Sequence, residues 1–150
     1  AVGGRGGKDA QNTIAEGGGG GGGRISLYSD NTAAYTGTLT ATGGLGFQKG
    51  SAGTIFQTNV AADNGGRLLV MNVDDGESSL TTLSTIVNTV SPYGILQELS
   101  VTDTAHVIYK VPGLTVQVQS FAGDGTGTLL FSENSEVLPY GAMGQSGVVD

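Results

Sequence analysis

The sequence contains no cysteine, no tryptophan and a single histidine, His106, in 150 residues. Without cysteine the chain has neither disulfides nor thiolate ligands for a metal ion. His106 lies between Ala105 and Val107 on the expected outward face of a strand, and one histidine is too few for a multi-histidine metal site. We therefore expect a surface or groove histidine with no catalytic constellation around it, no metal site, no organic cofactor and no enzymatic activity.

Charge is also scarce, because only 13% of the residues are charged, roughly half the usual share. Six scattered Lys and Arg residues against 13 Asp and Glu residues leave a net charge of −7. Such a chain lacks the basic stripe that follows a phosphate backbone, so no nucleic-acid partner is expected. Neither a basic amphipathic helix nor an apolar run of about 18 residues is present, so we expect no membrane insertion.

The sequence begins at Ala1 and shows no signal-peptide pattern. We interpret it as a mature or excised segment of a secreted protein from which the targeting signal has been removed. The expected location is extracellular or at the cell surface.

Glycine is abundant, with 28 residues, and it dominates the first 23 positions. We expect a glycine-rich arm over 1–23 and a body over 24–150. A glycine run is typical of a flexible linker. Glycine has no Cβ, however, so extended glycine segments can approach closely and exchange backbone hydrogen bonds. We expect ordered packing, against neighbouring coils or another subunit, and predict an assembly role for the unbroken run of Gly17, Gly18, Gly19, Gly20, Gly21, Gly22 and Gly23.

The remainder of the chain has the period-two alternation and β-branched residues that are typical of strands. Turn formers such as Gly43-Gly44 and Pro112-Gly113 separate the strands, and the only plausible helix is a short piece within 79–89. We expect one all-β domain, either a solenoid or an antiparallel sandwich. The expected strands lie at 24–28, 36–42, 53–56, 67–71, 99–101, 107–111, 114–118 and 127–131.

The alternation also predicts which side chains face the interior. They are Ile25, Leu27, Leu39, Ile55, Leu69, Val101, Val107, Val116, Val118 and Leu129.

A series of motifs follows in order over about fifty residues. They are the glycine run, a strand at 24–28, a strand at 37–41, a Gly-Gly turn at 43–44, a strand at 52–56 and an Asp-Asn-Gly-Gly turn at 63–66. This order resembles a Gly-rich parallel β-helix repeat of large bacterial surface and adhesin-like proteins. The resemblance implies surface display and a structural or adhesive role without chemistry. We therefore expect a right-handed parallel β-helix, with the antiparallel β-sandwich as the alternative.

Four other sites have simpler interpretations. The segment GGRGGKD lacks the Gly-Lys-Ser/Thr of a phosphate loop and follows no strand. The acidic turns Asp74-Asp75-Gly76-Glu77 and Gly123-Asp124-Gly125-Thr126 lack the regular ligand spacing of calcium loops. A glycosidase needs two positioned acids and usually aromatic sugar platforms, which are scarce here. The Thr36, Thr38, Thr40 and Thr42 face shows one threonine rung, whereas an ice-binding ladder repeats it.

A solenoid leaves open edges at its two ends, and these must be capped or paired. We therefore expect a structural subunit of an extracellular fibre or surface layer, assembling with copies of itself through strand edges and the glycine-rich arm. The alternatives are a segment of a monomeric adhesin stalk and a carbohydrate-active β-helix enzyme. The sequence identifies no receptor or surface glycan.

Overall fold

The computed structural model describes residues 1–7, 17–31, 34–60, 65–72, 85–87, 95–109, 113, 115–131 and 136–139, with backbone alone for 85–87 and 136–139. Apart from one short 3₁₀ turn at Ala34, the regular secondary structure of these residues is strand, which confirms the all-β class. The strands are β1 (Arg24–Ser29), β2 (Thr54–Asn59), β3 (Gly66–Met71), β4 (Thr85–Val87), β5 (Ile95–Thr102), β6 (His106–Tyr109), β7 (Thr115–Gly123), β8 (Thr128–Phe131) and β9 (Glu136–Pro139).

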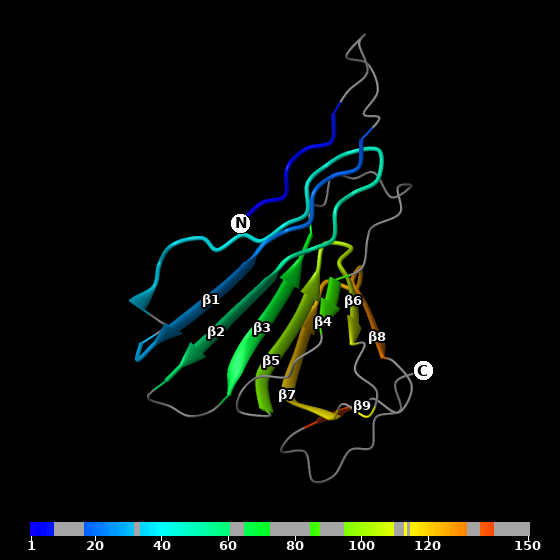
Figure 1. Cartoon of the computed structure of the whole chain (residues 1–150). Helices are drawn as coiled ribbons and strands as arrows, with labels where there is room; N and C mark the ends of the chain where they lie inside the picture. The colour runs from blue at the N-terminus through cyan, green and yellow to red at the C-terminus, as the bar shows by residue number, and fades with distance from the viewer. Residues whose placement is uncertain are drawn as a thin grey trace.

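The strands form two sheets (Figure 1). One has six strands in the order β1-β2-β3-β5-β7-β9, and the other has three in the order β4-β6-β8. From β3 onward the chain alternates between the sheets, and within each sheet these strands pair in parallel.

A step of 22 residues relates the central strands of both sheets. Leu96 of β5 pairs with Val118 of β7, and His106 of β6 pairs with Thr128 of β8. Thr85 of β4 pairs with Val107 of β6 at the same step. At the ends of the parallel series the step differs, because Arg67 of β3 pairs with Glu98 of β5 and Thr115 of β7 pairs with Glu136 of β9. From β4 to β8, each 22-residue unit therefore contributes one strand to each sheet and lies directly on the unit before it.

The first two strands depart from this arrangement. β1 pairs in parallel with β2, but β2 pairs antiparallel with β3. Both strands therefore run opposite to the other four strands of the six-stranded sheet, and β1 forms one edge of that sheet.

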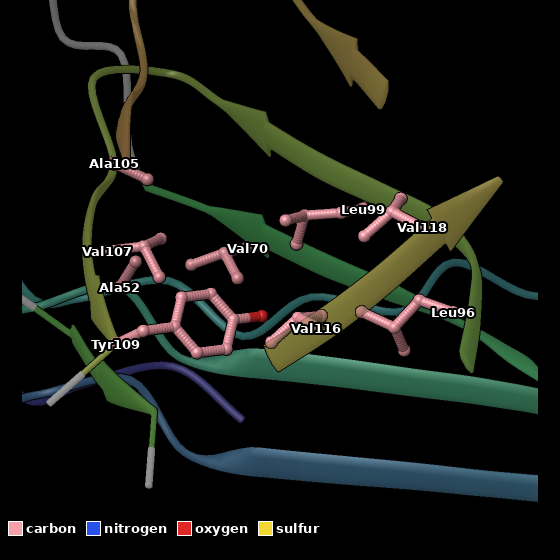
Figure 2. Packing of buried hydrophobic residues seen from close by; sticks show 9 residues of the cluster. All are labelled: Ala52, Val70, Leu96, Leu99, Ala105, Val107, Tyr109, Val116 and Val118. Carbon is pink, nitrogen blue, oxygen red and sulfur yellow. The ribbon is translucent and has the colours of Figure 1, made fainter. Parts of the chain in front are cut away.

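The core lies between the two sheets, where equivalent side chains of successive units stack. Tyr109 of β6 stacks on Phe131 of β8 with ring centroids 5.5 Å apart, and its ring lies close to Val70 and Val116 (Figure 2). Phe56, Leu68, Val101 and Leu129 pack against this cluster from its margins. The buried members are Ala52, Val70, Leu96, Leu99, Ala105, Val107, Tyr109, Val116 and Val118.

The predicted side chains are all at least partly buried. Val107, Val116 and Val118 are buried in the core cluster, and Ile55 is buried outside it. In β2 the residue that packs against the cluster is Phe56, whereas Ile55 pairs with Leu69 on the opposite face. In β3, Val70 is fully buried and Leu69 is only partly so. Leu68 and Val70 pair with Leu99 and Val101 on the core face, so the prediction for Leu69 was wrong by one residue.

Two predicted elements are wrong. Residues 36–42 form no strand, and at the end of this segment Ala41 and Thr42 instead accept hydrogen bonds from the N–H groups of Gly53 and Gly3. Within the predicted helix, residues 85–87 form β4, whose β-branched Thr, Ile and Val favour a strand. The other residues of 79–89, together with 110–112 and 114, lie outside the described residues, as do 63 and 64 of the turn predicted at 63–66.

Candidate assembly surface: the glycine bundle and the sheet edges

Four glycine-rich segments, 1–7, 17–23, 41–46 and 48–53, pack against one another, and we call them the glycine bundle. They run side by side away from the starts of β1 and β2 (Figure 1). Gly17–Gly23 lies between the other segments, because Gly20 receives a hydrogen bond from Gly44 and donates one to Gly4. The predicted arm is thus hydrogen-bonded to residues that the sequence places in the body.

The hydrogen bonds of the central segment recur every third residue. The N–H groups of Gly17, Gly20 and Gly23 donate to the carbonyls of Gly7, Gly4 and Ala1 at 3.2, 2.8 and 3.5 Å. Those of Gly19 and Gly22 donate in another direction, to Gln48 and Ser51 at 2.8 and 2.9 Å. A strand would alternate every second residue, whereas three residues per turn is the period of a polyproline II helix. The glycine bundle is therefore built from threefold extended helices.

Other segments of the bundle follow the same period. Gly3 and Gly6 donate to Thr42 and Leu45 at 2.9 and 2.8 Å. Gly50 and Gly53 donate to Gly44 and Ala41 at 3.0 and 2.6 Å. This periodicity replaces the strand that alternation predicted up to Thr42.

Close backbone approach explains why these positions are glycine. A Cβ at Gly19 would overlap the carbonyl of Gly44, and one at Gly22 would lie 2.5 Å from the nitrogen of Gly53. By contrast, a Cβ at Gly18 would have its nearest neighbour at 3.8 Å, and Gly4 and Gly7 would meet nothing within 4 Å. The bundle therefore has a tightly packed interior and an open side.

Two contacts fasten the bundle. The side-chain oxygen of Asn72, directly after β3, accepts from Gly43 N–H at 3.2 Å, and its amide nitrogen donates to the Gly50 carbonyl at 3.3 Å. Asn72 is 4% exposed, so it joins two glycine segments to the sheet in a buried position. The Ala1 ammonium donates to the Thr40 carbonyl at 2.6 Å.

The predicted assembly residues Gly17–Gly23 thus have partners within their own chain. Gly18 and Gly21 are exposed, on the side away from the tight contacts. An assembly role for the run stays a prediction.

The open edge of β1 is the second surface. Gly23 and Ser29 accept hydrogen bonds from Thr54 and Val60 at 3.2 and 3.0 Å, on the β2 side. Backbone groups of successive strand residues point to opposite sides, so those of Arg24, Ser26 and Tyr28 point toward the open edge. The strand contains no proline and one charged residue, Arg24, at its start.

A third surface lies at the last described unit of the stack. Phe121, Leu130 and Phe131 are 55%, 48% and 36% exposed. One unit earlier, Leu99 and Tyr109 pair with Phe121 and Phe131 and are each 1% exposed. Equivalent side chains are therefore buried where a further unit covers them and exposed where the stack ends.

The Asp124 turn uses its carboxylate to hold backbone. Asp124 accepts from Asp103 N–H at 2.8 Å, and from the N–H and hydroxyl of Thr126 at 2.9 and 2.7 Å. These bonds, first the one from Asp103, lower the pKa of Asp124 to about 2. Asp103 and Thr104 have positive φ, a conformation that costs energy in residues other than glycine. The Asp124 carboxylate therefore stabilises this turn.

The remaining predicted sites come together in no cluster that the structure describes. His106 pairs with Thr128 in the ladder of β6 and β8. Gly3 and Gly6 of the GGRGGKD segment donate their N–H groups to other carbonyls, so they do not cradle a phosphate. Asp74, Asp75 and Glu77 lie outside the described residues. Among the residues described, no group of three or more His, Asp or Glu side chains is placed to hold a metal ion.

Comparisons with protein-family models, curated proteins and solved structures found no match. A search of the described part of the chain for membrane-spanning helices found none of sufficient length and apolarity.

Sequence reasoning missed two features of these surfaces. The threefold packing is indicated by glycines at 43, 44, 46, 50 and 53, of which the sequence predictions place Gly43 and Gly44 in a turn and Gly53 in a strand and leave Gly46 and Gly50 unassigned. Asn72 carries no local signal, because its partners lie 22 and 29 residues earlier in the sequence.

Proposed function

We propose that this chain is a structural subunit of an extracellular fibre or surface layer, built as a right-handed parallel β-helix with a glycine bundle at its N-terminal end. The observation that carries the proposal is the 22-residue step shared by both sheets. Such stacking buries apolar rows unit on unit and leaves edges at the ends, which are natural sites for self-association.

Two features support a structural role. The glycine bundle is held mainly by backbone hydrogen bonds and gives a stiff element with few side chains. The apolar side chains Phe121, Leu130 and Phe131 remain exposed at the last described unit, as a surface that would be covered on assembly.

Electron microscopy of the purified 150-residue chain over a range of concentrations tests this proposal. We expect regular fibres or sheets, with a spacing of about 4.7–4.9 Å between paired strands in X-ray diffraction from aligned samples. A chain that stays monomeric at the highest attainable concentration would exclude the subunit role.

A segment of a monomeric adhesin stalk is the second candidate, favoured by the hydrogen bonds that close the glycine bundle within one chain. It predicts a monomer in solution, elongated in small-angle scattering. The carbohydrate-active alternative predicts polysaccharide cleavage that disappears when one acidic residue is replaced.

A further inference from the structure

The edge of β1 has two unpaired charges, one at each end. Arg24 begins the strand and Asp30 follows its last residue, and both side chains are exposed. Neither makes an ion pair within the described part of the chain. At about 3.3 Å per residue they lie roughly 20 Å apart, too far to pair with each other.

We propose that two copies of this chain join edge to edge through antiparallel pairing of β1, with Arg24 of each copy opposite Asp30 of the other. The inference rests on the proposed self-assembling function, and it names the edge and the partner. Two six-stranded sheets would then form one continuous sheet.

The hydrogen-bonding pattern restricts the register of this pairing. The even-numbered residues point their backbone groups to the open edge, so an antiparallel partner must pair even residues with even residues. Ser26 can then lie opposite Ser26, Tyr28 or Asp30 of the second copy. Only the Ser26–Tyr28 register places Arg24 opposite Asp30, and twofold symmetry forms that pair twice.

The side chains suit this register. Directly opposed residues share a face of the sheet with Cβ atoms about 4.5–5.5 Å apart, which is within reach of an Arg–Asp ion pair. On the other face Leu27 meets Leu27 of the second copy, and Ile25 meets Ser29. No like charges are opposed. Because the same patch is used by both copies, the dimer is closed. A fibre would need one further contact, such as the exposed end at β8.

Charge reversal gives a sharp test by sedimentation velocity at low and high salt. Arg24→Glu and Asp30→Arg each place like charges opposite one another twice, so we expect each to weaken dimerisation about tenfold or more. The double variant R24E/D30R restores both pairs and should dimerise like the parent. An equimolar mixture of the two single variants should also dimerise. In the mixed pair the introduced glutamate of one chain meets the introduced arginine of the other, and the unchanged Asp30 of the first meets the unchanged Arg24 of the second.

The matched control is Arg5→Glu, which makes the same charge change at an exposed position away from β1. It should leave dimerisation unchanged, and all variants should keep the parent's circular dichroism and urea midpoint. Dimers insensitive to the single variants, or not restored in the double variant, would overturn the inference.

Electron microscopy separates this inference from the proposed function. Fibres that persist together with charge-insensitive dimers would leave the subunit role standing and reject the β1 edge. Charge-dependent dimers without fibres would support the β1 edge and reject the fibre. A parent chain that is monomeric throughout would reject both.

Discussion

An alanine scan of the glycine run from 17 to 23 should reveal a period of three in the free energy of unfolding. Gly19→Ala and Gly22→Ala place a methyl group against backbone that cannot move aside without breaking hydrogen bonds. Overpacking costs about 1–3 kcal/mol. A methyl group at Gly19 would also disturb two hydrogen bonds, from Gly19 N–H to the Gln48 carbonyl and from Gly44 N–H to the Gly20 carbonyl. Each is 2.8 Å long and contributes about 1 kcal/mol. We expect a total loss of about 2–4 kcal/mol at each position, a large fraction of a typical domain stability.

Gly18→Ala is the matched control, since its Cβ would have 3.8 Å of clearance and Gly18 has no positive φ. Alanine there restricts the unfolded chain and should raise the free energy of unfolding by about 0.4–1 kcal/mol. Gly21→Ala would meet only the Ser51 hydroxyl, at 3.1 Å, and should be nearly neutral.

Urea unfolding followed by tyrosine fluorescence and circular dichroism measures these differences, and hydrogen exchange of the glycine amides shows whether the bundle opens separately. Losses at 19 and 22 with tolerance at 18 and 21 would establish threefold packing. Equal tolerance along the whole run would indicate a flexible linker, and losses at every second residue would indicate a strand. Either outcome would refute the threefold packing.

Three further substitutions test contacts outside the run, each by urea unfolding. Asn72→Ala removes both side-chain bonds that hold Gly43 and Gly50, and should lower the free energy of unfolding by about 1–3 kcal/mol. Tyr109→Phe removes a buried hydroxyl that has no hydrogen-bond partner among the described residues, and should raise the free energy of unfolding by about 1 kcal/mol. A lower free energy of unfolding would indicate that the hydroxyl has a partner. The pKa of Asp124 is lowered to about 2 in the folded chain, against about 3.9 in the unfolded chain. The ionised carboxylate therefore stabilises the fold fully above about pH 3.9, and this contribution is lost as the pH falls through about 2. Asp124→Asn should therefore reduce the acid dependence of stability over that range, and an unchanged profile would contradict this.

The strands could be predicted from the sequence where alternation and β-branching agree. β1, β3 and β8 lie within one residue of their predicted bounds, β2 extends three residues past its predicted end at 56, and Val107, Val116 and Val118 face the core as expected. β3 shows the limit of this reasoning, because its sequence Leu68-Leu69-Val70 is apolar at every position. Only pairing with Leu99 and Val101 determines which side chains are buried.

The glycine bundle could not be predicted in the same way, because its specificity lies in the backbone. The period of a strand or helix is visible in a sequence when polar and apolar residues alternate. Seven consecutive glycines have no such alternation. Thr36–Thr42 gave a false period of two, since alternate threonines fit a strand whether or not a partner strand is present. The parallel pairing of the strands likewise depends on contacts about 22 residues apart, which local propensity does not encode.

The direction of β1 and β2 makes the two ends of the stack unequal for association. At β8 the three-stranded sheet ends in a strand whose neighbour, β6, is parallel to it. Extending the repeat there requires another parallel strand carrying apolar residues opposite Leu129 and Phe131. At β1 the sheet ends in a strand that runs against β3 and β5, so adding a parallel unit would not continue the repeat. Antiparallel pairing of β1 with itself needs no such continuation, and the opposite charges of Arg24 and Asp30 favour it. We therefore expect charge and salt to control association at β1, and apolar burial to control it at β8.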